Sequence, residues 1–177
     1  MKLIKHTLLT TSAFLLMSMH TYAAEMKIGV IDQQIALFGT NYAAKEFEEL
    51  QNSDEFKEVQ EEAQQKVNEA QKLQEKGQKD GPTMSEQEKQ EMGLKLQSLS
   101  QDIKFLNEKL NQFVGQTRQL IVQAQSEKYS LVVTELIRAK GITLLLYGGQ
   151  ESQVVGYHDK SYDITQDVID AMNEKED

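Results

Sequence analysis

Apolar residues recur alternately four and three positions apart through a long stretch in the second half of the chain. A repeat of 3.5 residues sustained over this length predicts a long helix with a coiled-coil seam. The chain is therefore expected to be mainly α-helical. The series consists of Met92, Leu96, Leu99, Ile103, Leu106, Leu110, Phe113, Thr117, Leu120 and Ala124.

Local signals indicate where this helix begins and ends. Thr83 and Glu86 have the spacing of a capping box, which predicts a start near Met84. Lys140 is followed by Gly141, and glycine suits the left-handed cap that ends many helices. The helix is thus predicted to run from near Met84 to Lys140.

A thinner apolar stripe predicts an earlier helix from about Ala43 to Lys76. Residues 77–83, which contain two glycines and the only proline of the chain, predict a short tip between the two helices. A short connection makes neighbouring helices antiparallel, so residues 43–138 are predicted to form a helical hairpin. The stripe consists of Phe47, Leu50, Phe56, Val59, Ala63, Val67, Ala70 and Leu73.

Short apolar runs on both sides of the hairpin predict a small α/β head. Residues 27–32 and 142–147 are nearly continuous apolar runs, as in buried strands, and residues 153–157 are predicted to pair with the second of them. Residues 163–166 can cap a short C-terminal helix that carries Val168, Ile169 and Met172. Residues 24–42 and 139–177 are predicted to associate in one head, from which the hairpin projects.

The first 23 residues have the pattern of a secretory signal peptide. Lys2 and Lys5 form a basic start, a short apolar run follows, and Thr21 and Ala23 supply the small residues before a cut. Cleavage is predicted after about Ala23. The apolar run is shorter than the roughly 20 residues that span a bilayer, so the mature protein is expected to be exported without stable membrane insertion.

The mature chain is strongly acidic. The full chain has a formal net charge of −9, and the signal segment carries Lys2 and Lys5 but no acid, so the mature chain carries −11. Phosphate backbones and anionic lipids repel such a protein. Neither nucleic acid nor an anionic membrane is an expected partner.

Residues that would support enzyme chemistry are scarce. There is no cysteine, and beyond the signal segment His158 is the only histidine, which argues against a catalytic cysteine and against a two-histidine metal site. No nucleotide-binding loop or nucleophile elbow is present. We therefore predict a non-enzymatic protein without cofactor or metal. A weaker alternative is an envelope hydrolase or lectin that uses Tyr157, His158 and Asp159.

A long helical hairpin offers surface rather than a pocket. Apolar residues outside the seam are candidates for contact with a client polypeptide, although each could equally fill packing inside the hairpin: Phe56, Met84, Leu94 and Val114. Gly93 and Gly115 interrupt the helical run, where each costs about 1 kcal/mol relative to alanine. They are hinge candidates or simply tolerated positions.

These features together resemble the Skp family of periplasmic chaperones, also called OmpH-like. The resemblance covers nearly all of the mature chain and is carried by Ala24–Asp32, Leu37-Phe38, the hairpin, Gly141–Leu146, Tyr157 and Asp163–Ile169. It implies a periplasmic homotrimer that binds unfolded outer-membrane β-barrel proteins without ATP and prevents their aggregation. It also implies that the heads associate through Ile28, Val30, Ile142, Leu144 and Leu146.

One feature departs from the family pattern. Well-known Skp proteins have basic arms, whereas the first predicted helix here is acidic and the second is about neutral. This difference argues against electrostatic capture of acidic clients or lipopolysaccharide, and favours apolar contacts. The main alternative is a coiled-coil structural or adaptor protein of the cell envelope, which would bind one folded partner.

Overall fold

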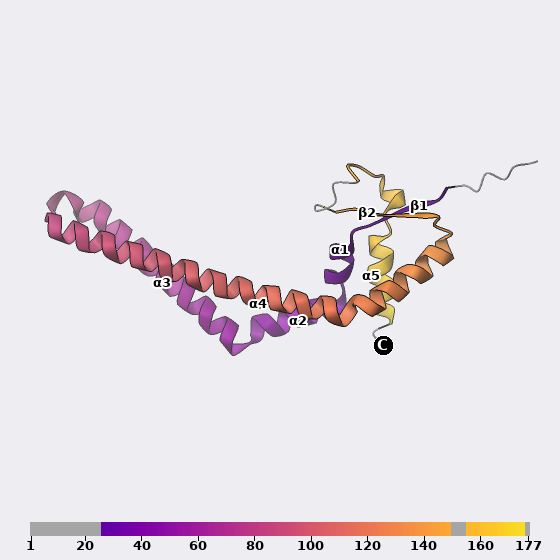
Figure 1. Cartoon of the computed structure of the whole chain (residues 1–177). Helices are drawn as coiled ribbons and strands as arrows, with labels where there is room; N and C mark the ends of the chain where they lie inside the picture. Colours follow the sequence, from indigo (N-terminus) through magenta and orange to yellow (C-terminus); the bar gives the residue numbers. More distant parts are fainter. Residues whose placement is uncertain (1–25, 150–154, 176–177) are drawn as a thin grey trace, which may run out of the picture.

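The molecule is a long helical arm attached to a small mixed head (Figure 1). The computed structural model describes residues 26–149 and 155–175. This arrangement confirms the predicted fold class, a mainly α-helical chain with an antiparallel hairpin projecting from an α/β head. The arm consists of α2 (Asn41–Asn52), α3 (Asp54–Asp80), the short 3-10 turn η1 (Gly81–Thr83) and the part of α4 (Glu86–Lys140) that packs against them.

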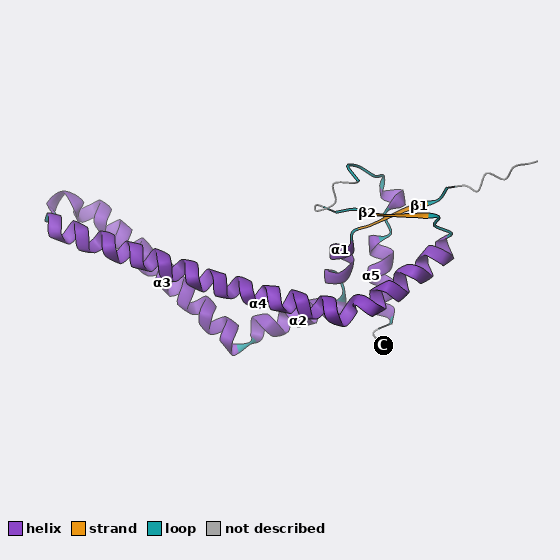
Figure 2. Ribbon diagram, viewed as in Figure 1, coloured by secondary structure: helices purple, strands orange, loops and turns teal. Residues whose placement is uncertain are grey.

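The first half of the hairpin is two helices, and the prediction of one continuous helix from Ala43 to Lys76 is wrong. Ser53 adopts an extended backbone between α2 and α3. Its hydroxyl accepts a hydrogen bond from the Phe56 N–H at 3.3 Å and donates one to the Leu50 carbonyl at 2.8 Å. Serine favours such a cap because its side chain replaces a missing helical partner. The two helices meet at a bend, visible in Figure 2.

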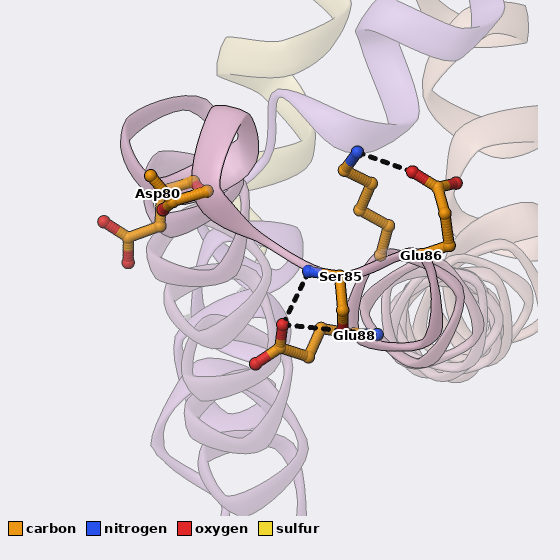
Figure 3. A network of polar contacts seen from close by, with 6 residues as sticks. Asp80, Ser85, Glu86 and Glu88 are labelled. Atoms are coloured by element: carbon orange, nitrogen blue, oxygen red, sulfur yellow. Dashed lines mark hydrogen bonds and ion pairs between the residues drawn. The ribbon is translucent and has the colours of Figure 1, made fainter.

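The capping box lies two residues later than predicted. The Glu88 N–H donates to the Ser85 hydroxyl at 3.3 Å, and the Ser85 N–H donates to the Glu88 carboxylate at 2.8 Å (Figure 3). The hydrogen bonds that the Ser85 N–H and the Ser85 hydroxyl donate to the Glu88 carboxylate lower the pKa of Glu88. Thr83 is instead part of η1, where its hydroxyl donates to the Asp80 carbonyl at 2.8 Å. Because Pro82 extends the tip by a 3-10 turn, α4 begins only at Glu86.

The predicted seam holds along the outer arm and fails near the head. Leu99, Leu106 and Thr117 are buried, but Leu120 is 55% exposed and Ala124 is also exposed. Beyond Thr117 the buried residues of α4 instead recur four apart, at Ile121, Gln125 and Tyr129. A 3.5-residue repeat suits two long helices wound around each other, whereas here α4 leaves α3 and packs against shorter elements.

The head contains a two-stranded parallel sheet. Strand β1 (Ile28–Ile31) pairs with β2 (Leu144–Tyr147), with Ile28 opposite Leu144 and Ile31 opposite Tyr147. On the other edge of β1, the Ile164 N–H donates to the Val30 carbonyl at 2.9 Å. The predicted third strand is wrong for the part that can be judged, since residues 155–157 form no strand. Residues 153 and 154 lie outside the described ones.

The head and the arm share one helix. The core of the head joins both strands and the short helices α1 (Gln33–Phe38) and α5 (Thr165–Glu174) to the last turns of α4. The helix ends as predicted at Gly141, whose φ of 65° is left-handed and whose N–H bonds the Arg138 carbonyl. The fully buried members of the head core are Ile31, Ala36, Val132, Val168 and Met172.

Candidate functional site

The described residues form a shallow hollow in the head but no cluster of possible metal ligands. No group of three or more possible metal ligands occurs among them, and none of the described helices is long and apolar enough to cross a membrane. A shallow hollow of about 310 Å³ lies at the carboxyl ends of β1 and β2, lined partly by Asp32, His158 and Asp163. Both carboxylates take part in local structure: Asp32 accepts the Ile35 N–H at 3.0 Å, and Asp163 accepts the Thr165 N–H at 2.8 Å.

The residues considered for a hydrolase or lectin do not converge on a common point of reaction. Tyr157 is 87% exposed, and the His158 Nδ1 lies 3.3 Å from the carbonyl of its own neighbour, Asp159. The Asp159 carboxylate accepts hydrogen bonds from the Ser161 N–H at 2.9 Å and hydroxyl at 2.7 Å, which lower its pKa. That carboxylate holds the turn η2 (Lys160–Tyr162) in place. The arrangement offers a surface feature without a paired acid and base.

The four candidates for client contact differ in their surroundings. Phe56 lies inside the hairpin, where its ring packs against that of Phe113 with centroids 6.2 Å apart. Met84 lies at the tip and is partly buried, as is Val114. Leu94 alone of the four is mostly exposed, at 60%. Client contact at these residues stays a prediction, and the geometry favours Leu94 most.

Three further apolar side chains on α4 are more than half exposed and were not among the predicted candidates. Phe105 is 65% exposed, Leu120 is 55% exposed and Leu131 is 57% exposed. Each directly precedes a buried residue, so the sequence contains adjacent apolar pairs of which only one member can face the seam. That pairing is the signal that could have identified them. Together with Leu94 they leave a sparse apolar row along the helix.

Charge is distributed unevenly over the arm. Residues 46–62, around the joint between α2 and α3, contain eight carboxylates and only one basic residue, Lys57. Ion pairs tie this acidic segment and the outer arm to α4, at Glu55–Lys109 (3.5 Å), Lys66–Asp102 (3.2 Å) and Glu69–Lys95 (3.0 Å). Asp102 raises the pKa of Lys66 through a hydrogen bond and its charge. Exposed pairs of this kind contribute little to stability, typically about 0–1 kcal/mol.

By contrast, residues 110–126 of α4 carry a single charge, Arg118. The guanidinium carbon of Arg118 lies 4.7 Å from the ring centroid of Phe38, so this cation stacks on the ring where α1 ends. The arm therefore combines an acidic segment on α2 and α3 with a stretch of α4 that carries one charged residue.

The residues predicted to associate the heads divide into two groups. Val30 and Ile142 are buried within the chain itself, at 3% and 9% exposure. Ile28 and Leu146 are partly buried, and Leu144 is 41% exposed. Strand β2 pairs with β1 along one edge only among the described residues. None of the described strands pairs with its other edge.

Comparison with known proteins identifies the family. The family model described as "Outer membrane protein (OmpH-like)" matches residues 27–172, which include the strands, the arm and most of α5. No curated protein matches the chain significantly. Proteins of this family are periplasmic chaperones of outer-membrane proteins, and the match extends over most of the sequence. The chain therefore belongs to the OmpH-like family, as the resemblance to Skp predicted.

Proposed function

We propose that the mature chain is an ATP-independent periplasmic holdase that binds unfolded outer-membrane β-barrel proteins and prevents their aggregation. The observation that carries this proposal is the row of large apolar side chains left exposed along α4 in a chain of the OmpH-like family. Apolar side chains exposed on a helix can contact the apolar side chains that an unfolded polypeptide exposes. The sparse spacing of the row suits many weak contacts.

Weak, repeated contacts fit a protein that holds and releases without nucleotide hydrolysis. A sparse row on a rigid helix binds many sequences with modest affinity, and several arms acting together raise the overall affinity through effective concentration. Release then follows when a competing assembly site binds the client more tightly.

Such an arrangement needs more than one arm, and the head supplies a means of association. The edge of β2 that pairs with no described strand, and the exposed side chain of Leu144, support pairing between copies of the chain. We propose a homotrimer of heads with the arms surrounding a client. Export through the predicted signal peptide places this assembly in the periplasm.

The test is an aggregation assay. A urea-denatured outer-membrane β-barrel protein is diluted into buffer with and without the purified mature chain, while light scattering and the mass of soluble complexes are followed. The proposal predicts suppressed scattering, a soluble complex, and no effect of ATP. A natively folded soluble protein serves as control and should not bind. Scattering as strong as in buffer alone would refute the proposal and favour a structural adaptor.

A further inference from the structure

We propose that the C-terminal helix α5 sets the direction in which the arm leaves the head, and that Asn173 is the positioning residue of this contact. This inference rests on the proposed function, because the direction of each arm decides how much space the arms of an assembly leave for a client. The contact lies at the corner where α1 ends and α2 begins, at Gly39, Thr40 and Asn41. We call residues 39–41 the arm root.

Three residues of α5, each about one helical turn after the last, follow α1 from its start to the arm root. The Thr165 hydroxyl accepts the backbone N–H of the residue before α1 at 2.9 Å. Ile169 lies against Gly39, where an added Cβ would come within 2.8 Å of the Ile169 Cδ1. The side-chain oxygen of Asn173 accepts the Asn41 N–H at 2.9 Å. Because residues four apart share one face of a helix, a single side of α5 contacts both ends of α1 and the first residue of α2.

The opposite side of α5 is attached to α4, and Figure 1 shows α5 between α1 and the end of α4. Ion pairs join Asp167 to Lys140 at 2.8 Å and Lys175 to Glu135 at 2.7 Å. Such exposed pairs contribute little to stability by themselves. Between them, the side chain of Met172 is fully buried in the head core together with residues of α4. Helix α5 therefore connects the arm root to α4 through a packed core.

Asn173 supplies a hydrogen bond that the arm root does not make by itself. The first N–H groups of a helix have no partner within that helix. Thr40, which is 1% exposed, accepts the Ala43 N–H through its hydroxyl at 3.2 Å, but the Asn41 N–H takes its acceptor from α5. A hydrogen bond is directional. The contact with Asn173 therefore restricts the orientation of α2 relative to α5 as well as their separation.

The second connection between arm and head is α4 itself, which bends beside the arm root. It runs from the arm into the head as one helix, and Figure 1 shows it changing direction where it enters the head. The Ser126 hydroxyl donates to the Val122 carbonyl one turn earlier, a bond that often bends helices. Arg118, one turn before Val122, stacks on Phe38 at the end of α1. Because a helix that bends here does not fix the angle of the arm alone, the corner held by α5 decides that angle.

A small change at the arm root is amplified along the arm. From Asn41 to Asp80 the helices α2 and α3 together have a length of about 60 Å, so a tilt of about 10° at the root moves the tip by up to about 10 Å. This displacement is about the diameter of a helix. Arms that point in different directions do not hold one client together, and the gain in effective concentration from several arms is then lost.

The experiment compares three variants of the full mature protein. Asn173→Ala removes the acceptor, whereas Asn173→Asp keeps an oxygen acceptor on a side chain of nearly the same size. Gln166→Ala is the matched control, because it removes a side-chain hydrogen bond of 2.9 Å that lies within α5, to Asp170, and does not involve the arm. Hydrogen exchange at the start of α2 and affinity for a urea-diluted outer-membrane β-barrel protein are measured for each. The distance between labels at Gln51→Cys on α2 and Lys160→Cys in η2, both exposed positions, is measured with labelled chains diluted in unlabelled ones.

We expect the Asn41 N–H of Asn173→Ala to exchange about fivefold faster or more, as for the loss of one hydrogen bond. The label distance should shift or broaden, and the client should bind about threefold more weakly or worse. Asn173→Asp and Gln166→Ala should behave like the wild type in all three measurements.

An unchanged label distance in Asn173→Ala, or an equal change in Asn173→Asp, would overturn the assignment. Faster exchange throughout the head would overturn it too, because the contact would then only support folding. Unchanged client affinity despite a changed distance would refute the positioning role. If the wild type binds no client, the proposed function fails, while exchange and label distance still decide whether α5 sets the direction of the arm.

Discussion

Glycine-to-alanine substitutions at two positions of α4 should change stability in opposite directions. Gly115 lies within the helix, and a Cβ added there meets no atom within 4 Å. Gly141 ends the helix, also has open space around an added Cβ, but has a φ of 65°. Neighbouring atoms should therefore contribute little to the change in the free energy of unfolding at either site. Only the backbone conformation distinguishes them.

The magnitudes follow from the backbone alone. Gly115→Ala should raise the free energy of unfolding by about 0.5–1 kcal/mol, because alanine loses less conformational entropy in a helix. Gly141→Ala should lower it by about 1–2 kcal/mol, the cost of a left-handed conformation for a residue with a Cβ. The two variants should thus differ by about 2 kcal/mol. A Cβ added at Gly93 also meets no atom within 4 Å, so Gly93→Ala is a second test of the stabilisation expected for Gly115→Ala.

The assay is urea unfolding followed by circular dichroism at one fixed protein concentration, because the apparent stability of an oligomer depends on concentration. Lower stability in Gly115→Ala, or unchanged stability in Gly141→Ala, would refute the reasoning. The same variants also test the hinge hypothesis. If Gly93 and Gly115 act as hinges, the alanine variants should hold client less well while being more stable; unchanged client binding would leave them as tolerated positions.

Three further predictions concern packing, capping and titration. Ile121→Ala should cost about 2–5 kcal/mol in urea unfolding, because Ile121 is fully buried, whereas Leu120→Ala should cost little. Ser85→Ala should cost about 1 kcal/mol and speed hydrogen exchange at the tip, and Thr83→Ala should cost less. Burial raises the pKa of the Tyr129 hydroxyl, which has no hydrogen-bond partner among the described residues. The unfolded chain therefore loses this proton first, so wild-type stability should fall as pH rises above about 10, and Tyr129→Phe should reduce that fall without loss of stability at neutral pH.

The sequence predicted the hairpin well because a seam between two long helices leaves a periodic trace. Leu106 is buried against Val59 and Ala63 of α3, and Leu99, seven residues earlier in the repeat, is also buried. The left-handed cap at Gly141 was equally readable, since few residues other than glycine adopt it. Local chemistry and regular packing agree at these positions. The structure at these positions could therefore be predicted without knowing how distant parts of the chain pack.

The sequence indicates the joint at Ser53 less clearly than it indicates the seam and the cap at Gly141. The apolar stripe of the first helix steps by three from Phe47 to Leu50 and then by six to Phe56, a gap that a single helix does not produce on one face. Within that gap, Ser53 is followed by two acidic residues, the composition of a helix start. The wrong capping box has a similar origin. Two matches overlap at the tip, and the turn begun by Pro82 selects the later one.

The exposed apolar row could not be separated from the seam by periodicity alone. Leu120 continues the 3.5-residue repeat in the sequence, yet it is exposed because α4 changes partners near that position, from α3 to α2 and the head. The number of turns that α3 covers depends on the joint at Ser53. Because the joint was missed, the seam was expected to extend further along α4 than it does. The parallel pairing of β1 with β2 likewise depends on how the arm returns to the head.

The acidic surface of the arm bears on the apolar side chains that α4 exposes. A helix that exposes Phe105, Leu120 and Leu131 risks association with its own copies, since large exposed apolar side chains promote it. The carboxylates of residues 46–62 lie on α2 and α3 of the same arm, and like charges on neighbouring arms repel one another. Arms held apart in this way leave the exposed apolar side chains of α4 accessible. Acidity in the first half of the hairpin therefore opposes self-association through the apolar side chains that the second half exposes.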